Sequence, residues 1–404
     1  MPGELDRIIP LSIEKCVFGG DGLARWGARA VFVPGALPGE DVLVRVTAEK
    51  KDFLRGRIEE VKTPSPHRVA PTCPRYGECP GCAYRHCGHA YENELKNAQF
   101  AEFAVRAGFA PGSLEPPLAP EPADGYRNKL VLHVGKTGGD TEIGYVGSDN
   151  QTVFPIEACP LAHPDINARL AEQLADPGFR HTLHHRMTLT YRRTERDGVL
   201  FYRNSAPKNL PWLHESTAAG DLRCPADGFF QVHPGGADAL LGEVRRRIAE
   251  FQPEAFLDLC CGAGLFSAAA AQENVPHLLG IDIAETSVAA ARYNLRERGR
   301  PDAEFSIGDA ASLVRTAAER FAGKRILSVL DPPRGGIDGG MRHALESLPA
   351  GSRLVYISCH PATWARDAAV LTAHGFAPIA ARMLNQFART AHLEVVSVLE
   401  RRSA

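Results

Sequence analysis

From about Asp227 to the C-terminus, short apolar segments alternate with segments of helical composition. Each apolar run is too short for a typical helix and is bounded by Gly, Pro or Asp, as buried strands are. Alternating strands and helices joined by short loops form a doubly wound α/β sheet, in which parallel strands end at one edge. The sequence therefore predicts a Rossmann-like domain over residues 227–404. Its expected strands are residues 255–259, 277–281, 303–307, 326–330, 353–358, 378–384 and 392–399.

The first three of these strands end in residues suited to a nucleotide-like ligand. A Gly-x-Gly turn, Gly262 to Gly264, follows the first strand, and this turn alone serves any nucleotide binder. Asp282 closes the second strand, where a carboxylate can bind ribose hydroxyls, and Asp309 closes the third, where it could reach an adenine amino group. The third glycine of a pyrophosphate loop is missing, so the set favours S-adenosylmethionine over NAD. The structural alternative for each acid is a helix N-cap.

Two later strands end in residues suited to chemistry. Asp331 opens an Asp-Pro-Pro-Arg turn that resembles the D/N-P-P turn of base methyltransferases, but Arg334 replaces the aromatic residue usual in enzymes that methylate amino groups. Arg334 could hold an anionic intermediate or a phosphate, or form a surface salt bridge. Cys359 stands between a strand and a helix that begins with Pro361, where a thiol is expected to gain thiolate character. The alternative for Cys359 is a small buried core residue.

A second constellation consists of cysteines. Cys73, Cys79 and Cys82 follow the spacing C-x5-C-x2-C in a loop rich in Pro and Gly. The ten cysteines do not form a secreted disulfide pattern, and the N-terminus lacks the apolar core of a signal peptide, so a reducing cytoplasm is expected. Such a cluster then indicates a metal site, with zinc and an iron–sulfur cluster equally compatible. The fourth ligand is either Cys87 or Cys159, which precedes a proline as cluster ligands do.

The N-terminal half is expected to bind RNA through local patches, because a net charge of −2 provides no general basic field. Residues 1–63 are typical of a small oligonucleotide-binding β-barrel, and residues 64–226 of a central α+β domain. Residues 126–129 and 191–193 interleave aromatic and basic side chains, as base-stacking surfaces do, although solvated strand ends fit equally well. No apolar run is long enough to cross a membrane, and no obligate protein partner is evident. The basic residues of the barrel are Arg25, Arg29, Arg45, Lys50, Lys51, Arg55 and Arg57.

Taken together, these motifs resemble the RNA 5-methyluridine methyltransferases, which include iron–sulfur rRNA uracil methyltransferases and tRNA 5-methyluridine synthases. The resemblance covers nearly the whole chain and identifies residues 1–63 as a TRAM-like barrel. Residues 228–232 resemble the family's F-x-Q motif, and residues 331–334, 358–361 and 390–394 match its later motifs.

The resemblance implies a role for each candidate residue. Cys359 would be the nucleophile and Glu394 the general base, with Asp331 holding the uracil and the methyl donor in line. Contacts to S-adenosylmethionine are expected from Gln231, Cys260, Gly262, Gly264, Leu265, Asp282, Asp309 and Asp331. A [4Fe–4S] cluster is expected on Cys73, Cys79, Cys82 and Cys159.

Three positions depart from the family pattern. Cys260 replaces an aromatic residue and Leu265 replaces Asn, while His360 stands where Asn is common. Cys260 would then contact the cofactor through its backbone only, and Leu265 cannot donate a hydrogen bond. None of these changes removes the nucleophile, the base or the ribose acid.

The expected function is methylation of C5 of a uridine in RNA, with 23S rRNA favoured because the tRNA enzymes of this family often lack both barrel and cluster. A uridine of the tRNA T-loop is the alternative substrate. A methyltransferase acting on exocyclic amines would leave Cys359 and Glu394 without roles. A non-catalytic iron–sulfur RNA-binding protein is the alternative outside enzymes.

Overall fold

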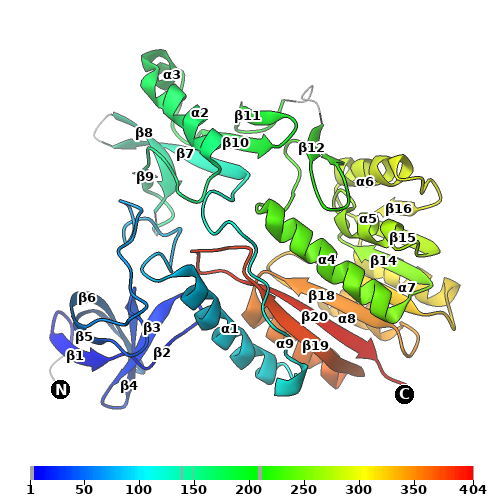
Figure 1. The fold of residues 1–404 in the computed structure, drawn as a ribbon, viewed down its shortest axis with the longest axis horizontal. Coiled ribbons are helices and arrows are strands. Elements are labelled where there is room, and N and C mark those ends of the chain that lie inside the picture. Colours follow the sequence, from blue (N-terminus) through cyan, green and yellow to red (C-terminus); the bar gives the residue numbers. More distant parts are fainter. Residues whose placement is uncertain (1–3, 138–139, 148, 208–211, 404) are drawn as a thin grey trace. The chain divides into compact units, whose positions relative to one another are not determined.

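The computed structural model describes residues 4–137, 140–147, 149–207 and 212–403 (Figure 1). The chain divides into two compact units. The first unit contains Met1–Gln99 and Phe387–His392, and the second contains Phe100–Gln386 and Leu393–Ala404. The three-domain division expected from the sequence stays a prediction.

The first unit is built on a six-stranded sheet in the order β1-β5-β6-β4-β3-β2. Along β1 the burial alternates residue by residue, so one face of the sheet covers an apolar core. Gly56 lets β6 approach β5 closely, because a Cβ at this position would lie 2.2 Å from the side chain of Val44. The strands are β1 (Ile8–Ser12), β2 (Lys15–Cys16), β3 (Asp21–Trp26), β4 (Arg29–Pro34), β5 (Asp41–Glu49) and β6 (Phe53–Thr63).

Helix α1 (His89–Arg106) continues from the first unit into the second, since the division between the units falls at Gln99. In its first half, Lys96 and Glu92 form an ion pair at 2.8 Å whose side chains are both fully buried. The sequence predicts one amphipathic helix over residues 91–108, and the observed helix agrees with it to within two residues at each end.

The second unit begins with an antiparallel five-stranded sheet in the order β11-β10-β7-β8-β9. The sequence predicts antiparallel strands at 130–134, 142–146, 187–191 and 199–203 and a helix near 165–174. The observed elements confirm these to within a few residues. The elements are η1 (Pro111–Ser113), β7 (Lys129–Thr137), β8 (Asp140–Val146), β9 (Val153–Pro155), α2 (Pro164–Ala175), α3 (Pro177–His181), β10 (Thr188–Thr194), β11 (Gly198–Arg203), β12 (Leu213–Glu215) and β13 (Leu222–Cys224).

The prediction that Tyr126 and Tyr191 stack on RNA bases is wrong. Tyr191 is fully buried, and Tyr126 is 3% exposed and stacks on His233 with ring centres 4.5 Å apart. Arg192 is also buried. These side chains belong to the interior of the fold, so the aromatic rings cannot receive a base.

The rest of the second unit is the doubly wound sheet, in the order β16-β15-β14-β17-β18-β20-β19. Its central strands pair in parallel, whereas β20 runs antiparallel to both β18 and β19. One apolar core joins the sheet to α4, α5 and α6. The seven expected strands are confirmed, except that the last begins at Glu394 instead of His392. The strands are β14 (Ala255–Leu259), β15 (His277–Asp282), β16 (Glu304–Ile307), β17 (Ile326–Leu330), β18 (Arg353–Ser358), β19 (Phe376–Leu384) and β20 (Glu394–Arg401).

Three helices around this sheet, α4, α8 and α9, begin directly after a residue whose side chain caps the helix. Pro234 and Pro361 stand at the first turns of α4 and α9, which accept proline because those N–H groups have no helical partner. Among the described residues, none of the helices is both long and apolar enough to span a membrane. The helices are α4 (Pro234–Phe251), α5 (Leu265–Gln272), α6 (Glu285–Glu297), α7 (Ala310–Arg320), α8 (Gly339–Glu346) and α9 (Pro361–Ala373).

Candidate active site

Cys359 and Glu394 come together through the pairing of β18 with β20. The last register pair of these antiparallel strands is Ser358 with Val395. Cys359 directly follows Ser358, and Glu394 directly precedes Val395, so both residues stand at the same edge of the sheet. Asp331 reaches this edge from the neighbouring strand β17, which pairs in parallel with β18. This is the carboxyl edge, where open α/β sheets bind ligands.

Three carboxyl groups at this edge have raised pKa values. Burial raises the pKa of Glu394, which is 3% exposed, and the negative charge of Asp331 raises it further. Burial and then Asp258 raise the pKa of Asp331 to about 7. Asp258 is fully buried, and its pKa is raised to about 6 although Ser267 donates to it through both N–H and O–H. A positive charge placed at this edge would favour the ionised forms of all three carboxyl groups.

The expectation that Cys359 gains thiolate character is wrong for the free protein. Burial raises the pKa of this thiol above its ordinary value, and the charges of Glu394 and Asp331 raise it further. The opposing influence is Arg334, which lowers the pKa through its charge and a hydrogen bond. Burial and the carboxylates across the edge thus favour the neutral thiol, against the influence of Arg334.

The glycine turn after β14 has a backbone conformation that lets a ligand approach the main chain closely. Cys260, Gly262 and Gly264 all adopt positive φ angles of 68°, 51° and 85°. The N–H of Gly262 donates to Asp282 Oδ2 at 2.9 Å, so the loop and the acid that closes β15 are held together. Asp282 also accepts from the N–H of Ala284 at 2.9 Å.

The remaining cofactor candidates surround this loop. Leu265 begins α5 and is 8% exposed, so its side chain belongs to the core. Asp309 is exposed directly before α7 and makes no side-chain cap there. Burial and then the charges of Asp282, Asp331, Asp258 and Asp309 raise the pKa of Cys260 to about 12, which places these acids around the same turn.

Gln231 is buried and lies on a segment supported by Arg192. The Arg192 guanidinium donates to the carbonyls of Pro225, Ala226 and Gly228 at 2.9–3.0 Å and pairs with Glu215 at 2.9 Å. The backbone carbonyl of Gln231 accepts from Asn128 at 3.1 Å. A buried cation thus holds the turn that leads into the F-x-Q motif.

The four cysteines expected to hold a cluster belong to two different units. Cys73, Cys79 and Cys82 are half-buried residues of the first unit, in a turn closed by Tyr76 N–H donating to Cys73 O at 3.1 Å. Cys159 belongs to the second unit and is held by two hydrogen bonds with Asn167. Cys87 is 1% exposed, and its thiol donates to Tyr84 O at 3.4 Å. Three thiols on one loop fit a thiolate cluster chemically, although no group of three or more His, Cys, Asp or Glu side chains arranged for a metal occurs in the described part of the chain.

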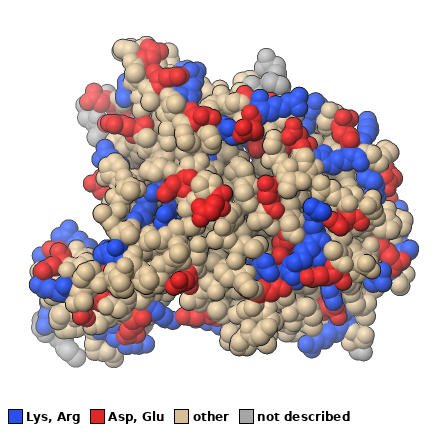
Figure 2. All heavy atoms as spheres, in the orientation of Figure 1, with Lys and Arg blue, Asp and Glu red and all other residues tan. Residues whose placement is uncertain are grey.

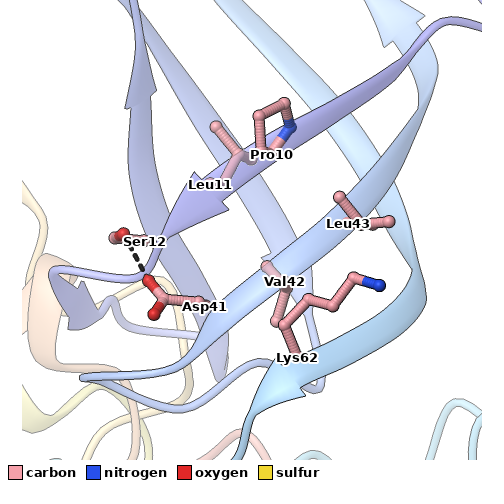
Figure 3. Close-up of a pocket in the computed structure, with 7 residues that line it drawn as sticks. All are labelled: Pro10, Leu11, Ser12, Asp41, Val42, Leu43 and Lys62. Carbon is pink, nitrogen blue, oxygen red and sulfur yellow. Dashed lines mark hydrogen bonds between the residues drawn. The ribbon is translucent and has the colours of Figure 1, made fainter.

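A pocket on the barrel lies apart from this chemistry. It is formed by β1, β5 and the end of β6 within the first unit, and Ser12 donates to Asp41 at its rim at 2.5 Å (Figure 3). Its walls carry no cysteine and no glutamate, so it holds neither the thiol nor the base expected for the chemistry. The lining residues are Pro10, Leu11, Ser12, Asp41, Val42, Leu43 and Lys62.

Charges on the surface are mixed instead of separated. On the face shown in Figure 2, basic and acidic side chains alternate over short distances. In the barrel, Arg29 pairs with Glu49, while Arg45 and Arg57 both pair with Glu59. Ion pairs of this kind leave such arginines less available for phosphates, and RNA contact by the barrel stays a prediction.

Sequence reasoning missed two residues of this site. The sequence marks Asp258 only as the acid before the glycine turn, although its charge acts on Asp331. Gln386 donates to Glu394 at 2.6 Å, and no motif marks it. Only the register of β19 and β20 reveals that contact.

Comparison with known proteins identifies the family. Residues 227–402 match the family described as tRNA (Uracil-5-)-methyltransferase, and residues 6–58 match the TRAM domain. The chain is 30% identical to the 23S rRNA (uracil(1939)-C(5))-methyltransferase RlmD of Aeromonas hydrophila, over 94% of this chain and 93% of that protein. It is 29% identical to an uncharacterized RNA methyltransferase of Thermosynechococcus vestitus, over 97% of both chains.

A solved structure shares the fold. The Pyrococcus abyssi tRNA (uracil-54, C5)-methyltransferase in complex with S-adenosyl-L-homocysteine superposes with a TM-score of 0.71 at 22% identity, covering 96% of this chain and 99% of that chain. This agrees with the α/β fold and N-terminal TRAM domain expected from the sequence. The chain therefore belongs to the family of RNA uracil-C5 methyltransferases, enzymes that use S-adenosylmethionine as the methyl donor.

Proposed function

We propose that this protein methylates C5 of a uridine in 23S rRNA. The observation that carries the proposal is the adjacency of Cys359 and Glu394 at the carboxyl edge of the sheet, created by the Ser358–Val395 register pair. Similarity to the Aeromonas 23S rRNA enzyme over 94% of the chain supports rRNA as the substrate. A uridine of the tRNA T-loop is the second candidate, supported by the tRNA family description that residues 227–402 match.

The chemistry requires a nucleophile because C5 of uracil is itself a poor one. Cys359, as a thiolate, adds to C6, and the electron pair of the C5–C6 double bond moves to give an enolate that is nucleophilic at C5. The proton of the thiol leaves to solvent, aided by Arg334. Bound S-adenosylmethionine supplies the methyl group that becomes attached to C5.

Glu394 completes the reaction as the base. Its carboxylate takes the proton from C5, the electron pair of that C–H bond restores the C5–C6 double bond, and Cys359 leaves C6 as a thiolate. The proton on Glu394 then passes to solvent. Asp331 holds the uracil and the methyl donor in line.

The methyl donor is held by residues of the adjoining strand ends. Asp282 binds the ribose hydroxyls, Asp309 reaches the adenine, and the backbone at Cys260, Gly262 and Gly264 approaches the donor closely. Gln231 contacts the donor from the segment that Arg192 supports, and Leu265 contributes an apolar wall. The target uridine must leave its stack to reach this edge, so an exposed or flippable base is expected.

The test is methylation of total RNA with a labelled methyl donor, followed by mapping of 5-methyluridine. Cys359→Ala is expected to abolish transfer and also to abolish the covalent adduct with RNA that contains 5-fluorouridine. Cys16→Ala, which removes a buried thiol of the barrel, is the matched control and should methylate normally. Turnover by Cys359→Ala would overturn the mechanism and favour methylation of an amine. RNA binding without transfer or adduct would favour a non-catalytic RNA-binding protein.

We also propose that Cys73, Cys79, Cys82 and Cys159 hold a [4Fe–4S] cluster. The support is the donor set, which consists of four cysteines, three of them within one short loop. Anaerobic reconstitution should give iron and sulfide in equal amounts with the broad visible absorption of such a cluster. Cys79→Ser should lose both, whereas Cys87→Ser should keep them. Binding of zinc with no sulfide would overturn this assignment and leave the proposed methylation untouched.

A further inference from the structure

We infer that Gln386 is a positioning residue for Glu394, which fixes the orientation of the carboxylate and keeps one of its oxygens turned toward the substrate. The inference rests on the proposed role of Glu394 as the base. It concerns a side chain outside the motifs on which that role depends.

The backbone brings the two residues together at the end of a hairpin. Leu384 and Glu394 are the last register pair of β19 and β20, and Gln386 lies two residues beyond Leu384. The N–H of Asn385 donates to Leu118 O at 2.8 Å, which fixes the chain directly before Gln386. The approach of Gln386 to Glu394 therefore follows from the sheet itself.

The side chain of Gln386 is confined. Gln386 is fully buried, and its Nε2 donates to Glu394 Oε2 at 2.6 Å. On its other side lies Gly236, in the first turn of α4. A Cβ at Gly236 would come within 2.7 Å of both Cβ and Oε1 of Gln386, so only glycine leaves room for this arrangement. A side chain confined in this way holds its hydrogen-bond partner at a fixed angle.

The hydrogen bond gives the two carboxylate oxygens of Glu394 different roles. Oε2 is occupied by the amide of Gln386, and Oε1 is the oxygen that can take the proton from C5. Donation to the ionised form favours that form, and Gln386 accordingly lowers the pKa of Glu394 against the effects of burial and Asp331. The amide thus helps to keep a buried base ionised.

The same amide can also serve the protonated base. Oε1 of Gln386 is buried and has no hydrogen-bond partner within the described ranges of the chain. A half-turn of the amide about the Cγ–Cδ bond, which leaves the rest of the confined side chain in place, would present this oxygen to the O–H of protonated Glu394. Gln386 could then hold Glu394 both before and after it takes the C5 proton.

Other charged groups also influence Glu394 and must be kept constant in a test. Asp331 and Arg334 lie on the turn after β17, and Cys359 follows β18. Asp258, at the end of β14, acts through Asp331. His233 caps α4 beside Gly236. A variant of Gln386 alters none of these groups.

Gln386→Met tests the inference, because it keeps the length of the side chain and removes the donor. Release of the C5 hydrogen from RNA labelled at that position should slow by about tenfold at neutral pH, because loss of the amide donor raises the pKa of Glu394 and leaves less of it ionised. The rate–pH profile should move to higher pH, with recovery in alkaline buffer. Adduct formation with 5-fluorouridine RNA should be unchanged, since it requires Cys359 but no loss of a C5 proton. Gln386→Glu should shift the profile further, because it places a second negative charge beside the base.

Gln272→Met, at a position at the end of α5 remote from the Cys359 edge, is the matched control and should behave as the unaltered protein. An unshifted pH profile and normal hydrogen release in Gln386→Met would overturn the inference. Loss of adduct formation in both Gln386 variants would overturn it too, because the residue would then act on the nucleophile or the fold. Normal hydrogen release by Glu394→Gln would instead overturn the proposed base.

Discussion

The negative charge of Glu394 raises the pKa of the Cys359 thiol. The proposed nucleophile and the proposed base therefore disfavour each other's ionised form, and yet the reaction needs both. Arg334 is the group that reduces this conflict, since its charge and hydrogen bond lower the pKa of the thiol. Arg334, in the Asp-Pro-Pro-Arg turn, thus favours the thiolate of Cys359 although a carboxylate base lies beside it.

Replacing Arg334 by Met should therefore reduce formation of the Cys359–uracil adduct. Each unit by which the pKa of the thiol rises lowers the thiolate fraction about tenfold at a fixed pH below that pKa. The rate of adduct formation with 5-fluorouridine RNA should fall accordingly and recover as pH rises. Arg334→Lys keeps the charge, so its rate of adduct formation should lie between those of Arg334→Met and the unaltered protein. Equal pH profiles for Arg334→Met and the unaltered protein would contradict the role of Arg334.

Asp258 should make the protein less stable as pH rises. Its pKa in the folded chain is about 6, above the ordinary value of 3.8, so the folded state binds more protons between those values. Folding stability contributed by Asp258 is then present at lower pH and is lost as pH rises from about 4 to about 6, by about 3 kcal/mol in all. Asp258→Asn should flatten this part of the curve in urea unfolding at a series of pH values. The exposed variant Asp52→Asn is the control, and parallel curves for Asp258→Asn and the unaltered protein would refute the prediction.

Arg192→Met should destabilise the second unit and weaken binding of the methyl donor. The change leaves Glu215 buried without its partner and leaves the carbonyls that precede Gln231 without their donor, at a cost of about 3–5 kcal/mol. The double variant Arg192→Met/Glu215→Leu should recover stability, because no unpaired charge remains. If the segment before Gln231 needs the guanidinium, donor affinity should stay low in the double variant. Calorimetric titration with S-adenosylhomocysteine separates the two effects.

Much of this architecture could be predicted from the sequence, because strands and their terminal residues leave local signals. Runs of apolar residues mark the doubly wound sheet, and the strand pattern alone is enough to put Asp331 and Cys359 at its carboxyl edge. The electrostatic state of that edge could not be predicted. The pKa of Cys359 depends on Glu394, which lies 35 positions away in the sequence and meets it only through the β18–β20 register. The burial of Tyr126 and Tyr191 was missed for a related reason, since alternation of aromatic and basic residues does not reveal which face of a strand is covered.

Gly264 should tolerate alanine less well than Gly262, although both belong to the same turn. Gly264 has a φ of 85°, and a Cβ there would lie 3.3 Å from side-chain atoms of Ala291 and Leu295, which belong to α6. Gly262 has a φ of 51°, and a Cβ there would meet nothing within 4 Å. Gly262→Ala should thus cost only the backbone penalty of about 1–2 kcal/mol, whereas Gly264→Ala adds a clash with a packed helix. Thermal unfolding should rank the variants in this order, and S-adenosylhomocysteine should bind Gly264→Ala more weakly because the turn must shift away from α6. Equal stability and affinity in the two variants would show that the turn adjusts freely, against the close packing of Gly264 on α6.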